Sequence, residues 1–176
     1  MNLKKPDRIG LEIPSKICSG CGHGIVSRLI AETADELNIN EKLVMIHDVA
    51  CGAMTKSNMR FDAIVTAHGR PIDTGSGYQK IRPENVTCVY IGDGACYSIG
   101  CAELVHAALR NDNISVIVTN NTLFGMTGGQ MSPATMPGEK TMSSIHGKDP
   151  EKYGTLDVFK LLGNMDIAYL ARGEVY

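Results

Sequence analysis

A single carboxylate between two glycines is the most informative feature of this sequence, in the stretch YIGDGACYSIG at residues 90–100. Asp93 follows a run of apolar, β-branched residues and precedes a segment with helical spacing of apolar residues. At the carboxyl end of a strand, glycines let the backbone approach a ligand, and the N-terminus of the next helix favours phosphate. A carboxylate would repel that phosphate unless a cation lay between them. The pattern therefore predicts that Asp93 shares Mg²⁺ with a phosphate group, as carboxylates in proteins commonly do.

Two amide side chains follow the next apolar run. The segment ISVIVTN at 114–120 leads into TNNTLFGMTGGQ at 119–130, which contains Asn121. Adjacent parallel strands bring their carboxyl ends to the same edge of a sheet, so we expect Asp93 and Asn121 to lie close together. Together with exposed backbone carbonyls, these two side chains could close one oxygen-ligand site around a diphosphate-bound Mg²⁺.

The remaining pattern predicts an α/β domain with a mostly parallel sheet flanked by helices. Continuous apolar runs rich in β-branched residues are typical of strands that are buried on both faces. The expected elements are strands at 42–49, 62–68, 85–91 and 114–120, helices at 25–37 and 97–110, and a short helix with one further strand within 155–173. Residues 122–154, rich in Gly, Pro, Met, Thr and Ser, predict a long functional loop. We expect an N-terminal arm at 1–17 and one domain at 18–176.

Composition excludes several classes of function. The chain of 176 residues has a net charge of −2, which argues against non-specific binding of nucleic acid. No apolar run reaches the length of about 18 residues expected of a membrane span. The first residues, MNLKKPDRIG, do not resemble a signal peptide, so we expect a cytoplasmic protein. In that compartment the six cysteines are more consistent with ligands, reactive thiols or buried apolar residues than with disulfides.

The first three cysteines have a spacing that suits thiolate ligands. Cys18 and Cys21 form a CxxC pair, and Cys51 follows after the first predicted strand. Such a set can serve zinc, iron–sulfur or redox chemistry, and the spacing alone leaves these alternatives open. The other three, Cys88, Cys96 and Cys101, lie in or beside the strand–helix–strand unit and are expected to be core thiols.

The motifs together resemble a known family. GDG followed by NN after the next strand is the signature of thiamine-diphosphate enzymes. With CSGCGHG at 18–24, AHGR at 67–70 and GMTGGQ at 125–130, the sequence resembles the β subunit of 2-oxoacid:ferredoxin oxidoreductases of the branched-chain 2-oxoacid or 2-oxoglutarate type. The resemblance implies the thiamine-diphosphate-binding fold, and within it the domain that binds the diphosphate.

The resemblance also implies roles for particular residues. Mg²⁺ would be bound by side-chain oxygens of Asp93 and Asn121 and by the backbone carbonyl of Leu123. The diphosphate pocket would be shaped by Gly92, Gly94, Thr127, Gly128 and Gly129, and the cofactor would lie against Cys21, Gly22, His23 and His68. A [4Fe–4S] cluster would be bound by Cys18, Cys21 and Cys51. Related β subunits carry a fourth cysteine further along, so we expect a C-terminally incomplete domain whose cluster is labile or takes a ligand from another chain.

The implied reaction is the CoA-dependent oxidative decarboxylation of a 2-oxoacid, with ferredoxin or a ferredoxin-like subunit accepting the electrons. The pyrimidine-binding half of the site would come from an α-type partner subunit, so the chain alone is expected to be inactive. Two alternatives use the same residues differently. One is a half-domain of a non-redox thiamine-dependent decarboxylase or synthase. The other is a structural zinc domain in which the CxxC pair acts with Cys51 or His23.

Overall fold

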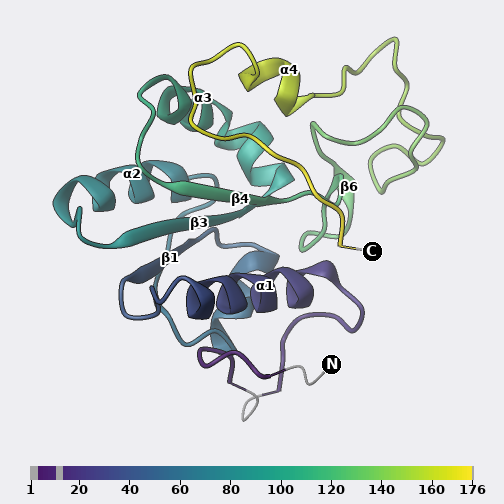
Figure 1. The fold of residues 1–176 in the computed structure, drawn as a ribbon. Helices are drawn as coiled ribbons and strands as arrows, with labels where there is room; N and C mark the ends of the chain where they lie inside the picture. Colours follow the sequence, from purple (N-terminus) through teal and green to yellow (C-terminus); the bar gives the residue numbers. More distant parts are fainter. Residues whose placement is uncertain (1–3, 11–13, 176) are drawn as a thin grey trace.

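A four-stranded parallel sheet forms the centre of the molecule (Figure 1). The computed structural model describes residues 4–10 and 14–175, so parts of the predicted arm, 1–3 and 11–13, lie outside the described residues. The strands are β1 (Leu43–His47), β2 (Asp62–Val65), β3 (Val86–Gly92) and β4 (Ser115–Thr119). They lie in the order β2-β1-β3-β4, and every neighbouring pair is parallel. The predicted parallel α/β architecture is therefore confirmed.

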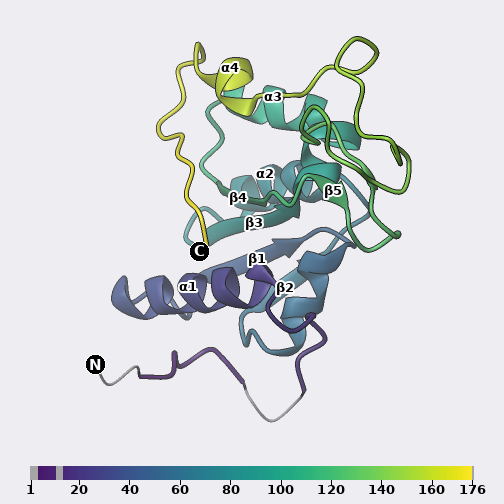
Figure 2. The same cartoon turned by 90° about the vertical axis from the view of Figure 1, so that its right-hand side faces the viewer.

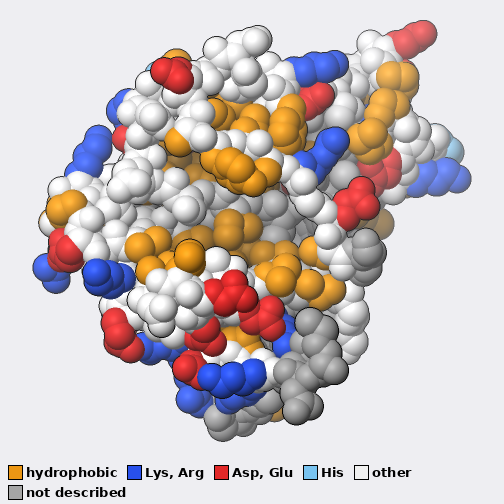
Figure 3. Space-filling view, viewed as in Figure 1, with side chains coloured by type: hydrophobic (Ala, Val, Ile, Leu, Met, Phe, Trp, Pro, Cys, Tyr) orange, Lys and Arg blue, Asp and Glu red, His pale blue; other side chains and the backbone are white. Residues whose placement is uncertain are grey.

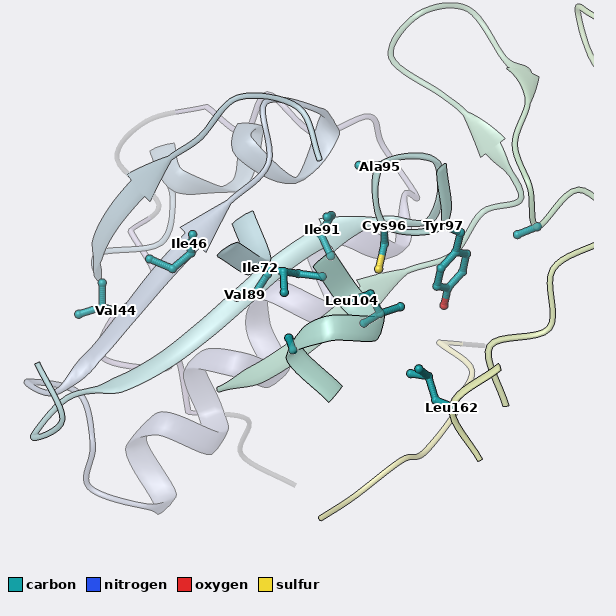
Figure 4. Packing of buried hydrophobic residues seen from close by; sticks show 12 residues of the cluster. Val44, Ile46, Ile72, Val89, Ile91, Ala95, Cys96, Tyr97, Leu104 and Leu162 are labelled. Atoms are coloured by element: carbon teal, nitrogen blue, oxygen red, sulfur yellow. The ribbon is translucent and has the colours of Figure 1, made fainter. Parts of the chain in front are cut away.

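Helices cover both faces of this sheet. The helix α1 (Gly22–Glu36) lies on one face, and α2 (Pro71–Ile81) and α3 (Cys101–Leu109) lie on the other, as Figure 2 shows. Alternate residues of the central strands therefore enter different cores, as the two-residue period of a strand requires. One core contains Val44, Ile46, Val89 and Ile91 with Ile72 of α2 and Leu104 of α3 (Figure 4). The other contains Met45, Cys88 and Tyr90 with Ile30 and Ala34 of α1.

The helix α2 is not predicted by the apolar pattern, because its sequence PIDTGSGYQKI holds two glycines and few apolar residues. Its start is nevertheless encoded, since Pro71 occupies the first turn, where its missing N–H costs nothing. Gly75 brings the helix close to the sheet. A Cβ at this position would lie 2.7 Å from Cγ2 of Val89, so only glycine allows this approach.

Three further segments differ from the predicted elements. The predicted helix at 97–110 is divided into a π-helical turn, η2 (Ala95–Ile99), and α3. A 3₁₀ segment, η1 (Cys51–Ser57), follows β1. The long loop contains a short antiparallel hairpin of β5 (Leu123–Phe124) and β6 (Gln130–Met131).

The strand predicted after the last helix is wrong. The short helix is present as α4 (Val158–Leu162), capped by the Asp157 side chain. Residues 166–173 form no strand, although Ile167 and Leu170 pack against the first core. This segment therefore contributes apolar contacts but does not pair with a strand of the sheet.

Candidate functional site

The carboxyl edge of the sheet gathers the polar residues that the sequence singles out. Asp48 follows β1 and Asp93 follows β3, while Asn121 lies just beyond β4. The ladder pairs Gly92 with Thr119, so the ends of β3 and β4 are level. The backbone N–H of Asn121 donates a hydrogen bond to the Asp93 carboxylate. The structure thus brings together the two residues that the sequence pairs at this edge.

Asp93 is a buried carboxylate, with only 1% of its surface exposed. The Ser132 hydroxyl donates to its Oδ2 at 2.5 Å, and backbone N–H groups of Gly94 and Asn121 also point at the carboxylate. Burial raises the pKa of Asp93, and these donors only partly offset that effect. Within residues 4–10 and 14–175, no ion pair includes Asp93. Among the described residues, the Asp93 carboxylate therefore has hydrogen-bond donors but no ion-pair partner.

Gly94 allows the long loop to close against this carboxylate. A Cβ at Gly94 would lie 2.6 Å from two ring carbons of Phe124, so the aromatic ring occupies the space that a side chain would need. A Cβ at Gly125 would lie 3.2 Å from Nδ2 of Asn121. The two glycines therefore allow the segment around Leu123 to lie directly over the end of β3.

Other predicted cofactor residues lie at the turn of the β5–β6 hairpin. Thr127 donates to the Phe124 carbonyl at 3.3 Å and to Oε1 of Gln130 at 2.6 Å. Gly128 has φ of 115°, a left-handed conformation that disfavours other residues. An open surface depression of about 400 Å³ is lined by Gly128, Gly129, Leu123 and part of the loop beyond, including Lys140 and Met142. The turn faces this depression, and the Thr127 hydroxyl is bonded within the turn rather than to Asp93.

His68 has a partner that sequence reasoning missed. Its Nδ1 lies 2.8 Å from Oδ2 of Asp48, and the backbone N–H of Gly69 donates to Oδ1 of Asp48 at 2.8 Å. Asp48 is 1% exposed, whereas the His68 side chain is 37% exposed. The His68 ring also lies 6.3 Å from the ring of Phe124, measured between centroids. Asp48 directly follows an apolar strand, as Asp93 does, and this position in the sequence could have identified Asp48 as a residue of the site.

Cys18 and Cys21 lie close enough to Cys51 for their charges to act on its thiol. Burial raises the pKa of Cys51, and the charges of Cys21 and Cys18 raise it further. The backbone N–H of Met126 donates to the Cys51 sulfur, which places this thiol against the loop that contains Asn121. In the part of the chain that the structure describes, no three His, Cys, Asp or Glu side chains form a ready site for a single metal ion.

The residues after Cys21 begin α1, with Gly22 as its first residue. His23 turns inward, and its Nδ1 lies 2.7 Å from the Tyr90 hydroxyl, which belongs to the buried strand β3. Burial lowers the pKa of His23. Among the remaining cysteines, Cys88 and Cys96 are buried as predicted, whereas Cys101 at the start of α3 is only partly buried.

The sequence profile of the family described as "Thiamine pyrophosphate enzyme, C-terminal TPP binding domain" matches residues 42–175. The chain belongs to this family. The match includes the four strands, the GDG turn and the whole of the long loop. The sheet edge described above is thus the edge of a thiamine-diphosphate-binding domain.

Within this family, the chain is similar to subunits of enzymes that are named for 2-oxoacids. The chain is 42% identical over 173 residues to the ketoisovalerate oxidoreductase subunit VorA of Methanothermobacter thermautotrophicus, covering 93% of this chain and 36% of that protein. It is 35% identical over 161 residues to the 2-oxoglutarate synthase subunit KorB of Methanocaldococcus jannaschii, covering 91% and 58%.

A solved structure is also similar: the 2-oxoglutarate:ferredoxin oxidoreductase from Magnetococcus marinus with 2-oxoglutarate, coenzyme A and succinyl-CoA bound. It matches with a TM-score of 0.76 and 30% identity, over 84% of this chain and 51% of that chain. The resemblance to 2-oxoacid:ferredoxin oxidoreductases is therefore confirmed. The chain spans between about a third and three fifths of the length of these proteins. Within its described residues, no helix is long and apolar enough to cross a membrane.

Proposed function

We propose that this chain is the diphosphate-binding part of a 2-oxoacid:ferredoxin oxidoreductase that uses thiamine diphosphate, Mg²⁺ and CoA. The observation that carries the proposal is the buried Asp93 carboxylate, which has hydrogen-bond donors but no cation within the described residues. A buried anion without a partner is costly, and a divalent cation would remove that cost. Thiamine diphosphate supplies the carbanion-stabilising chemistry when bound, and the protein holds and orients it.

The donors at the sheet edge fit Mg²⁺. Asp93 supplies a carboxylate, Asn121 an amide oxygen on an exposed side chain, and Leu123 a backbone carbonyl on the same loop. Mg²⁺ prefers about six oxygens, and diphosphate oxygens and water would complete the set. Gly92 and Gly94 keep side chains away from the end of β3, and Gly128 with Thr127 forms the turn that would face the diphosphate.

His68 is the group that we expect beside the reacting part of the cofactor. The Asp48 carboxylate lies 2.8 Å from Nδ1 of His68 and holds the ring in place, while the side chain stays 37% exposed. A fixed imidazole can donate or accept a proton at one defined atom, which is how histidines usually act in catalysis.

The thiols fit an iron–sulfur cluster. As thiolates, Cys18 and Cys21 would repel the Cys51 sulfur, and bound iron would offset that repulsion. Backbone N–H groups that point at sulfur, as Met126 does toward Cys51, also tune such clusters. Because Met126 belongs to the loop that contains Asn121, a cluster at these thiols would lie close to the cofactor and could accept its electrons.

The partners in this proposal are an α-type subunit that binds the pyrimidine ring and a ferredoxin or ferredoxin-like subunit. The long loop exposes apolar side chains at Met126, Met136, Met142 and Ile145, between 45% and 70% exposed. Figure 3 shows further hydrophobic side chains gathered across the face that carries α1 and β4. Exposed apolar surface of this kind commonly marks protein interfaces, and methionines adapt to a partner.

The cysteines of the described residues are free thiols, which suits a protein of the reducing cytoplasm.

The test uses the complete enzyme assembled with its partner subunits under anaerobic conditions. Wild-type enzyme should reduce a viologen dye with CoA and a branched-chain 2-oxoacid or 2-oxoglutarate. Asp93→Ala should abolish retention of thiamine diphosphate, and Asp93→Asn should weaken it, because an amide offsets less of the metal charge. The matched control is Asp62→Asn, an exposed aspartate at the opposite end of β2.

Retention of thiamine diphosphate by Asp93→Ala at the wild-type level would contradict the assignment of the metal site. A colourless enzyme that contains thiamine diphosphate but no iron would instead favour a non-redox decarboxylase or synthase. Stoichiometric zinc without thiamine diphosphate would favour the structural zinc domain.

A further inference from the structure

A segment far along the sequence holds the Asp93 side chain. The Ser132 hydroxyl donates to Oδ2 of Asp93 at 2.5 Å and accepts from the backbone N–H of Ala134 at 3.2 Å. Ser132 is 3% exposed, so water does not compete with either bond. Since one hydroxyl makes both bonds, the orientation of the Asp93 carboxylate depends on the position of the turn at 132–135.

The same turn also holds the backbone between the two other proposed ligands. The Thr135 hydroxyl donates to the Thr122 carbonyl at 2.5 Å and accepts from the backbone N–H of Ser132 at 2.8 Å. Thr122 lies between Asn121 and Leu123 and has φ of 64°, in the left-handed region that a β-branched residue rarely adopts. Such a conformation persists only where the surrounding structure imposes it. The completely buried Thr135 is one group that imposes it.

A buried lysine fixes the far end of the turn. Lys148 is 2% exposed, and its Nζ donates to the Thr135 carbonyl at 2.7 Å and to Oγ1 of Thr155 at 2.9 Å. Thr155 donates in turn to the same Thr135 carbonyl at 2.8 Å. Both hydrogen-bond acceptors of the ammonium are neutral, and within the described residues no ion pair includes Lys148. The charge of Glu139 only partly offsets the effect of burial, which lowers the pKa of Lys148. A buried cation is costly, so its retention here calls for a specific use.

We propose that Ser132, Thr135 and Lys148 form a brace that presets the distance between the Asp93 carboxylate and the Asn121–Leu123 segment before Mg²⁺ binds. The proposal rests on the proposed function and assigns positioning residues within that site. Mg²⁺ requires nearly octahedral geometry with short metal–oxygen distances of about 2.0–2.1 Å, so ligands from two separate loops must be held at the right separation. The three residues form one hydrogen-bonded chain that reaches both loops.

The test measures binding of Mg²⁺ rather than turnover alone. The assembled enzyme is stripped of metal, and thiamine diphosphate retention is measured by equilibrium dialysis as Mg²⁺ is added. Ser132→Ala and Thr135→Val should each raise the Mg²⁺ concentration for half-maximal retention by about 10–100-fold, the usual effect of removing a group that orients a ligand. Saturating Mg²⁺ should restore most of kcat, because no atom that touches substrate has changed.

Matched variants separate the brace from general damage to the loop. Ser143→Ala removes a hydroxyl of the same loop that accepts from the backbone N–H of Met131 at 2.9 Å and is not bonded to Asp93 or Thr122. We expect this variant to bind Mg²⁺ as the wild type does. Ser132→Thr keeps the hydroxyl and should rescue most of the affinity that Ser132→Ala loses. Lys148→Met should weaken Mg²⁺ binding in the same direction as Thr135→Val.

The outcomes distinguish the brace from the site itself. Wild-type Mg²⁺ dependence in both Ser132→Ala and Thr135→Val, together with loss of binding in Asp93→Ala, would overturn the brace and leave the metal site standing. Failure of the wild type to bind thiamine diphosphate at any Mg²⁺ concentration would overturn the proposed function. If Thr135→Val does not assemble, the comparison of Ser132→Ala with Ser132→Thr still decides the proposal.

Discussion

Gly94→Ala is the substitution whose effect can be worked out most directly from the structure. The added Cβ would lie 2.6 Å from two ring carbons of Phe124, whereas ordinary contacts begin at 3.4 Å. The ring must therefore withdraw by 3.4 − 2.6 = 0.8 Å. The backbone at Gly94 has φ of −58° and ψ of −41°, which alanine adopts without strain, so the clash alone acts.

The shift would be transmitted to the proposed metal ligands. Phe124 and Leu123 form the two-residue strand β5, so the ring cannot move far without moving the Leu123 carbonyl. A misplacement of about 1 Å can lower activity by roughly 10²-fold, and we expect a loss of that order in Mg²⁺ affinity. Overpacking of this kind also costs about 1–3 kcal/mol of stability.

Equilibrium dialysis of thiamine diphosphate against increasing Mg²⁺, with the thermal midpoint measured in parallel, separates these two effects. The control is Gly77→Ala in α2, where an added Cβ meets nothing within 4 Å and alanine favours the helix. The double variant Gly94→Ala with Phe124→Leu should recover part of the affinity, because the smaller side chain vacates space. Wild-type Mg²⁺ dependence in Gly94→Ala would refute the idea that the contact with Phe124 sets the position of the loop.

Three further predictions concern groups around the same edge. Burial lowers the pKa of His47 to about 4 from 6.5, so the unfolded chain binds the extra proton as the pH falls between these values. The free energy of unfolding, compared with that of a His47→Leu variant, should therefore drop by roughly 2 kcal/mol from pH 7 to pH 5. Chemical denaturation at the two pH values measures this difference. Asp48→Asn and His68→Ala should lower kcat by similar factors, and the double variant should be no worse than either, because Asp48 acts through His68. Additive losses would contradict that coupling. Cys51→Ser should reduce the iron content and the visible absorbance of the assembled enzyme while thiamine diphosphate is still retained.

The sequence predicted the centre of the fold because local pattern and tertiary position agree there. Residues 85–91 and 114–120 are continuous apolar runs, and the structure places them as neighbouring parallel strands. The proximity of Asp93 and Asn121 follows from that pairing alone, since both come directly after strands whose ends are level. The GDG turn and the amide pair could therefore be placed at one edge without knowledge of any side-chain contact.

The contacts that orient these residues could not be predicted in the same way. Ser132 and Asp93 are separated by 39 positions, and nothing in the local pattern around Ser132 distinguishes it from the other hydroxyl residues of the loop. Lys148 follows His146 and Gly147 in a polar stretch that is typical of exposed loops, yet it is buried. The absence of a strand at 166–173 has the same origin, because pairing depends on a tertiary neighbour that an apolar pattern does not specify.

The two aspartates at the sheet edge explain why the proposed metal site is at Asp93. Asp48 and Asp93 both end central strands, both are 1% exposed, and both contribute negative charge near the buried thiol of Cys96. Asp48 already has a histidine and a backbone N–H as partners, whereas within residues 4–10 and 14–175 the partners of Asp93 are a hydroxyl and backbone N–H groups. A buried carboxylate is tolerated only if its negative charge is offset. His68 and the backbone N–H of Gly69 hold the Asp48 carboxylate. Among the described residues, the carboxylate without an ion-pair partner is Asp93, which lies in the GDG turn and accepts a hydrogen bond from the backbone N–H of Asn121.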